Sequence, residues 1–295
     1  VGTSEGALGT CCDFQSMITE KGNASGSAFK FPNTVYNAAG GYLSICSGIK
    51  GYNVTVTNGA QSGLASMAYA MSVLRSGQEN AMLATGSDEN SDIMTELFGK
   101  LGVTSEKVVA PFAGNDGFVL SDGSASVLIE DEKVARERGA RIYCHAAGYG
   151  MAHSNVKFGT LTGSEAGLTN AVNNALADAG MTIDDIDAVF GFANGMKAVD
   201  DVEIKGLTAV FGDKLAEKPV VELKEVLGES RAAAATTAAA HAALMFAGKI
   251  PSQEAYSIAA DGSVSKTNVE ASKLNNVLVV AYGAGGSYTA IVLSK

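Results

Sequence analysis

Apolar stretches of strand length alternate with helical patterns along almost the whole chain, and this alternation restricts the fold more than any other feature. The expected strands cover residues 53–57, 81–85, 124–129, 141–149, 186–192, 220–223, 276–282 and 287–293. The expected helices cover residues 34–48, 63–76, 131–139, 165–179, 201–211 and 230–247. Because helices that follow strands in this order pack on the faces of the sheets they connect, the pattern predicts an α/β fold.

The last two expected strands are joined by Gly283-Ala284-Gly285-Gly286, a turn that favours an antiparallel hairpin. No stretch of the chain has the composition of a linker, and the charged residues 130–138 fit the solvated face of a helix. The strand and helix pattern resumes in the second part of the chain. This pattern allows two similar halves, residues 1–150 and residues 151–295, but it does not by itself demonstrate a duplication.

Composition excludes several kinds of protein. The net charge is −10 with no cluster of Lys or Arg, which argues against a nucleic-acid partner. No apolar run reaches the roughly 20 residues of a membrane helix. The four cysteines and three histidines lack the spacing of metal ligands. We expect a cytoplasmic protein with no metal and no cofactor.

Residues 110–151 carry the most specific motif, APFAGNDGFVLSDGSASVLIEDEKVARERGARIYCHAAGYGM. This stretch resembles the beta-ketoacyl synthase family of the thiolase superfamily, whose members show R-P-F-D, DGFV-x-GEG, A-x-x-RGA and IYAE-x-x-GYG in the same order and spacing. The resemblance implies a layered α-β-α-β-α fold in which residues 1–150 are the remainder of an N-terminal ketosynthase-like half. Residues 151–295 would then be the C-terminal half.

Further landmarks follow in the family's order. TVTNGAQSGL (55–64) resembles the nucleophile elbow, DDIDAVFGFANG (184–195) resembles the strand that ends in N-A-H-G-T, and ELKEVLG (222–228) resembles the K-x-x-x-G-H segment. YGAGGS (282–287) resembles the glycine-rich F-G-F-G-G-T. The chain corresponds to about the last three quarters of a family member. The family's first strand and the helices after it have no counterpart in these 295 residues.

The resemblance places the family's acyl-accepting cysteine at Ala60. A shift of one residue would place it at Gln61, a residue type that some partner subunits of the family carry at this position. Neither side chain can form an acyl-enzyme, because neither holds a nucleophile. The family cysteine lies at a helix N-terminus, where the helix dipole favours the thiolate.

The two histidines that stabilise the enolate in the family correspond to Asn194 and Glu229, and the family lysine is retained as Lys224. Asparagine cannot carry the charge of an imidazolium. A carboxylate at position 229 would repel a malonyl carboxylate and an enolate, while its place before a helix suits the helix dipole. We expect Lys224 to be structural and to pair with Glu229 or Glu225.

Loss of all three catalytic groups favours a non-catalytic subunit of the chain-length-factor type. Such a chain pairs with an active ketosynthase as a heterodimer, receives the acyl carrier protein and shapes the acyl-chain tunnel in polyketide or fatty-acid-type biosynthesis. Two alternatives remain open. One is a divergent enzyme, a malonyl-thioester decarboxylase or acyltransferase that uses Asn194 and Gln61. The other is a scaffold for carrier-protein docking.

Tunnel residues are expected in the segments 10–19 and 35–47, which the resemblance places near a partner's tunnel. Helical spacing places Cys11, Phe14 and Ile18 on one face, so these residues, with Gln61, are the candidates for limiting product length. The ordinary alternative is that Cys11, Phe14 and Ile18 belong to the hydrophobic core.

Overall fold

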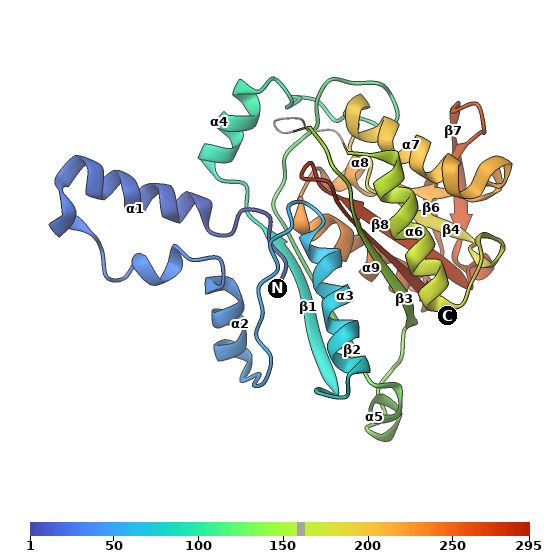
Figure 1. Ribbon diagram of the computed structural model, residues 1–295, viewed down its shortest axis with the longest axis horizontal. Helices are drawn as coiled ribbons and strands as arrows, with labels where there is room; N and C mark the ends of the chain where they lie inside the picture. Colours follow the sequence, from blue (N-terminus) through green and yellow to red (C-terminus); the bar gives the residue numbers. More distant parts are fainter. Residues whose placement is uncertain (158–162) are drawn as a thin grey trace.

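A computed structural model describes residues 1–157 and 163–295. The helices are α1 (Leu8–Lys21), α2 (Ala38–Ser47), α3 (Ser62–Arg75), α4 (Asp92–Lys100), α5 (Glu132–Glu137), α6 (Glu165–Ala179), α7 (Lys197–Phe211), α8 (Lys224–Leu227) and α9 (Ala232–Phe246). The strands are β1 (Ala81–Asp88), β2 (Gly123–Glu130), β3 (His145–His153), β4 (Ala188–Phe190), β5 (Val220–Val221), β6 (Ser252–Ile258), β7 (Val264–Glu270), β8 (Asn276–Tyr282) and β9 (Ser287–Ser294). Figure 1 shows their arrangement.

The first half of the chain builds a small sheet around β1 and β2, which pair antiparallel from Ala81↔Glu130 to Asp88↔Gly123. The first three residues of the chain extend this sheet, because Gly2 forms parallel bridges to both Val56 and Gly86. The second half builds a seven-stranded sheet in the order β3-β9-β8-β4-β5-β6-β7. In that sheet β4 runs parallel to β8 and to β5, and the other neighbouring pairs are antiparallel.

Helices α3 and α9 form the layer between the two sheets, since both pack against β1, β2 and β9 and against each other. Two glycines permit this close packing. A Cβ added to Gly63 of α3 would lie 2.0 Å from the carbonyl oxygen of Ala232, and one added to Gly86 of β1 would lie 2.4 Å from the same oxygen. Helices α6 and α7 pack together, and α6 lies against β3 and β9.

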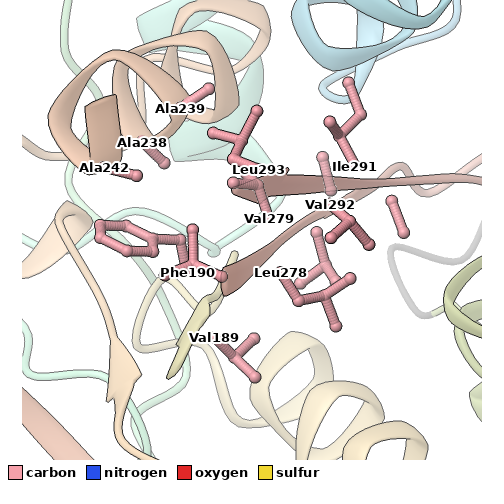
Figure 2. Packing of buried hydrophobic residues seen from close by; sticks show 14 of the residues in the cluster. Val189, Phe190, Ala238, Ala239, Ala242, Leu278, Val279, Ile291, Val292 and Leu293 are labelled. Atoms are coloured by element: carbon pink, nitrogen blue, oxygen red, sulfur yellow. The ribbon is translucent and has the colours of Figure 1, made fainter. Parts of the chain in front are cut away.

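The core centres on the strands of the larger sheet and the alanine-rich face of α9. Figure 2 shows Ala238, Ala239 and Ala242 of α9 beside Phe190 of β4 and Leu293 of β9. The side chains of β4, and those of β8 from Val277 onward, are all buried, as expected for strands covered on both faces. The α/β class is therefore confirmed.

The segment from α1 to α2 forms an arm that projects away from the two sheets (Figure 1). Helix α1 contains no buried residue, and Gly40 is the one buried residue of α2. Large apolar side chains on the arm face solvent, among them Phe29, which is 92% exposed, and Ile45, which is 77% exposed. The interpretation of Cys11, Phe14 and Ile18 as core residues is therefore wrong for this chain.

Most predicted elements are present, and α6 and β8 have the predicted bounds. Strand β3 begins at His145 instead of residue 141, because its ladder with β9 begins where His145 faces Ser294, at the end of β9. The predicted strand 53–57 is reduced to a bridge at Val56. Helix α4 and the hairpin β6–β7 were not predicted. The division of the chain at residue 150 stays a prediction.

Candidate functional site

The start of α3 is where the resemblance places an acyl-accepting residue, and Ala60 lies two residues before the helix begins. Gly59, in the left-handed region at φ +69°, gives the turn its shape. The hydroxyl of Ser62 stabilises the turn with two hydrogen bonds. Its Oγ accepts from the N–H of Asn58 at 2.7 Å and donates to the carbonyl of Gly59 at 2.6 Å. The side chain of Ala60 is a methyl group, so the turn holds no nucleophile at this position.

Gln61 follows Ala60, but its side chain is completely buried and engaged with β9. Its Oε1 accepts a hydrogen bond from Thr289 Oγ1 at 2.5 Å. Ala60 instead lies beside the glycine-rich turn. Its backbone nitrogen is 3.6 Å from the point where a Cβ would lie if Gly283 carried a side chain. The side chain of Gln61 has no exposed surface in this chain. The assignment of Ala60 as the counterpart of the family cysteine, and of Gln61 as a tunnel residue, stays a prediction.

Asn194, Lys224 and Glu229 come together in one buried cluster. The ammonium of Lys224 donates to Glu229 Oε2 at 2.8 Å and to the carbonyl of Phe192 at 3.0 Å. Asn194 Nδ2 donates to the same oxygen of Glu229 at 2.9 Å. The ring of Phe192 adds a cation–π contact, with its centroid 3.1 Å from the ammonium. Lys224 therefore contacts Glu229, whereas Glu225 pairs with Lys266.

The second oxygen of Glu229 is also occupied, because Oε1 accepts from the backbone N–H of Arg231 at 2.8 Å. Arg231 is the residue before α9, so Glu229 lies at the positive end of that helix dipole, as its sequence position suggested. Both polar atoms of the Asn194 amide form hydrogen bonds. Its Nδ2 donates to Glu229, and its Oδ1 accepts from the N–H of Met196 at 3.1 Å. The three side chains thus bond to one another and to nearby backbone.

A group of buried acids lies next to this cluster, and the sequence interpretation missed it. Asp200 and Glu203 point inward from α7, and Glu222 lies just before α8. Asp200 accepts hydrogen bonds from the N–H groups of Phe112, Asn194 and Gly195. Burial is the main cause that raises the pKa of Asp200, to about 6. The spacing of Asp200 and Glu203, three residues apart soon after Asn194, is the signal that could have revealed them.

Arg231 links residues that precede the arm to the start of α9, because its side chain contacts Glu5, just before α1. It has a left-handed backbone with φ 51°, and its side chain is buried. Its Nε lies 3.0 Å from Glu5 Oε2 and 3.9 Å from Asp88 Oδ2, and its Nη2 donates to the carbonyl of Glu89 at 2.6 Å. Burial raises the pKa of Glu5 to about 7, although Arg231 opposes this shift.

Cys11, Phe14 and Ile18 lie on α1, which projects away from α7 and α8 (Figure 1). Helix α1 packs against η1 (Asn23–Ser25), η2 (Phe31–Asn33) and α4. The ring of Phe14 lies 5.8 Å from that of Phe31. These residues contribute to the surface of the arm, and their role in limiting product length stays a proposal.

Within residues 1–157 and 163–295, no group of three or more His, Cys, Asp and Glu side chains could hold a metal ion. In the same described part of the chain, none of the helices has both the length and the apolar character needed to cross a membrane.

Comparison with known proteins identifies the relatives of this chain. The 3-oxoacyl-[acyl-carrier-protein] synthase 2 of Vibrio harveyi is 29% identical over 229 residues, which cover 75% of this chain and 55% of that protein. The putative polyketide beta-ketoacyl synthase 1 of Streptomyces cyaneus is 28% identical over 259 residues, covering 84% of this chain and 61% of that protein. Matches of this kind span little more than half the length of the curated relatives.

Solved structures confirm the thiolase-like fold. A chain of the ishigamide ketosynthase/chain length factor superposes with a TM-score of 0.88 at 23% identity, over 100% of this chain and 74% of that one. A beta-ketoacyl synthase from Burkholderia phymatum superposes with a TM-score of 0.86 at 20% identity, over 100% of this chain and 74% of that one. The family models for the N-terminal and C-terminal domains of beta-ketoacyl synthase match residues 1–135 and 143–256. This chain belongs to the beta-ketoacyl synthase family.

Proposed function

We propose that this chain is a non-catalytic ketosynthase-like subunit of the chain-length-factor type. It pairs with an active ketosynthase and shapes the acyl-chain tunnel in polyketide or fatty-acid-type biosynthesis. The observation that carries the proposal is the closed hydrogen-bonded cluster of Asn194, Lys224 and Glu229, together with the methyl group of Ala60 at the elbow.

The cluster is unsuited to stabilising an enolate. Such catalysis needs hydrogen-bond donors that are aimed at the developing oxyanion and free to meet it. Here Lys224 and Asn194 both donate to a carboxylate that already lies in the site. That carboxylate would oppose a second negative charge, and displacing it would leave a buried charge unpaired.

The alternative of a decarboxylase that uses Asn194 and Gln61 has less support. The amide of Asn194 is held between Glu229 and the N–H of Met196. Gln61 is buried against Thr289, so presenting its amide to a substrate would require repacking of the layer between α3 and β9. Neither amide is available in this conformation.

The arm supports the assignment of a protein partner. Contiguous exposed apolar patches on a folded protein mark sites of interaction. Phe29, Phe31, Tyr42 and Ile45 all project into solvent from the arm. An active ketosynthase that covers these side chains would remove them from water and would hold α1 at the junction of the two subunits.

The names of two structural neighbours agree with these partners. One is described as a ketosynthase/chain length factor, and another as a type II polyketide synthase acyl-carrier protein in complex with its ketosynthase. By analogy with them, the partners proposed for this chain are an active ketosynthase and an acyl carrier protein.

Co-expression with a ketosynthase that retains the cysteine and both histidines tests the proposal. The expected result is a stable one-to-one complex that makes product, whereas this chain alone makes none. Product formation by this chain without a partner would contradict the proposal, as would a partner whose products are unchanged by this chain.

A further inference from the structure

Glu203 and Glu222 lie next to each other, against Gly191, in the interior of the second half. Their exposed fractions are 0% and 4%. A Cβ added to Gly191 would lie 2.2 Å from Glu203 Oε1 and 1.9 Å from Glu222 Oε1, so both oxygens occupy the same side of this glycine. Gly191 directly precedes Phe192, whose carbonyl binds Lys224. The two acids therefore lie at the base of the Asn194 cluster.

If both acids are ionised, three of their four carboxylate oxygens lack a hydrogen-bond donor among the described residues. Glu203 Oε2 accepts from the N–H of Phe192 at 2.7 Å. It shares the single proton of the Tyr282 hydroxyl, at 3.2 Å, with the carbonyl oxygen of Val199, at 3.1 Å. Glu203 Oε1 and both oxygens of Glu222 have no donor among the described residues. Buried carboxylate oxygens without donors are strongly unfavourable, and two adjacent carboxylates also repel each other.

Cations are too few to neutralise this region. The titratable groups that face Glu222 are Glu203 and Asp200 from α7, Lys224 from α8 and Tyr282 from β8. Lys224 is the one cation in that set, and its ammonium already binds Glu229 and the carbonyl of Phe192. An ionised Glu222 would compete with Glu229 for this ammonium.

We propose that Glu222 is a neutral carboxylic acid in the folded protein and shares its proton with Glu203, forming an acid pair that leaves Lys224 bound to Glu229. The proton supplies the donor that Glu203 Oε1 lacks and removes the repulsion between the two carboxyl groups. Burial raises the pKa of Glu222 well above its usual value, and the neighbouring charge of Glu203 raises it further.

The pair makes folding depend on pH. Because the pKa of Glu222 is higher in the folded protein than in the unfolded chain, folding takes up a proton once the pH exceeds the unfolded value of 4.5. The contribution of Glu222 to stability therefore falls as the pH rises from 4.5 towards its folded pKa. Glu222→Gln keeps a neutral donor of similar shape and removes this dependence.

Infrared difference spectroscopy of the full chain against Glu222→Gln at neutral pH tests the proposal directly. The expected spectrum shows the carbonyl band of a protonated carboxylic acid in the natural chain, absent from the variant. A difference spectrum with only carboxylate bands would overturn the proposal. Glu217→Gln, an exposed glutamate in the same half, is the matched control and should leave the acid band in place.

Urea denaturation gives a second readout. Between about pH 6 and about pH 9, the midpoint for Glu222→Gln should fall by less than half as much as the midpoint of the natural chain. Equal falls in the two proteins would contradict a shared proton. A midpoint that changes with the identity of the monovalent cation at constant ionic strength would also contradict it, since it would indicate a bound ion between the carboxylates.

Discussion

The ammonium of Lys224 lies 2.8 Å from a carboxylate oxygen of Glu229, and solvent reaches only 5% and 6% of the two side chains. A lysine five residues before a histidine is the arrangement that the family resemblance implies, and here the histidine is replaced by an acid. The replacement joins the two side chains as a buried ion pair. This contact is one of the observations on which the proposed non-catalytic role depends.

Removing one member of this pair should destabilise the chain strongly. Lys224→Met leaves the Glu229 carboxylate buried without its cation, which should lower the free energy of unfolding by about 3–5 kcal/mol. Urea denaturation measures the loss. Lys266→Met, which breaks the more exposed pair with Glu225, is the control and should cost less than about 1 kcal/mol. Equal losses in the two variants would show that burial of the Lys224 pair has no energetic consequence.

The apolar arm should be necessary for binding a partner. Ile45→Glu places a charge on a side chain that is 77% exposed, so the fold should be retained while the heterodimer with an active ketosynthase dissociates. Light scattering after size exclusion measures the assembly. Val226→Glu changes an equally exposed side chain on α8 and should leave the complex intact. If Ile45→Glu still forms the complex with unchanged affinity, the arm is not the interface.

Phe14 should affect product length more than stability. Phe14→Ala removes a ring that packs on Phe31 but lies on a helix without buried residues, so the melting temperature should change little. In the reconstituted heterodimer the space freed should permit longer acyl chains, which mass spectrometry of the products detects. Gln15→Ala, on the exposed side of the same helix, is the control. An unchanged distribution of lengths would remove Phe14 from the tunnel.

Glu5 should give the stability a second dependence on pH. Its pKa rises from 4.5 to about 7 on folding, chiefly because of burial, so its contribution to stability falls as the pH rises through that window. Glu5→Gln should flatten the change in melting temperature between about pH 5 and about pH 8. Glu20→Gln, exposed on α1, should reproduce the natural curve. A Glu5→Gln curve that follows the natural one would show that the carboxyl group does not take up a proton on folding.

The sequence predicted most of the second half of the fold, because its elements have strong local patterns. Helix α6 combines an acidic first turn at Glu165 with a glycine C-cap at Gly180, and its bounds were predicted correctly. Strand β7 was missed because it alternates exposed polar side chains with few buried ones. The position of residues 1–3 inside the smaller sheet depends on contacts far along the chain, with Val56 and Gly86, which local patterns cannot indicate.

The candidate site was predicted only in part. Motif positions identified Asn194, Lys224 and Glu229, which the fold brings together from segments up to 35 residues apart. The acid pair of Glu203 and Glu222 depends on the approach of two segments at Gly191, and a pattern of single residues does not reveal such an approach. The orientation of Gln61 towards Thr289 likewise depends on the packing of α3 against β9.

Intact-mass spectrometry of the reconstituted heterodimer tests the central claim most directly. After incubation with an acyl carrier thioester, the active ketosynthase should gain one acyl group while this chain keeps its mass, because Ala60 holds no nucleophile. A ketosynthase partner whose cysteine is replaced by alanine is the control, and no acyl group should then appear on either chain. A stoichiometric acyl adduct on any residue of this chain would contradict its assignment as a non-catalytic subunit.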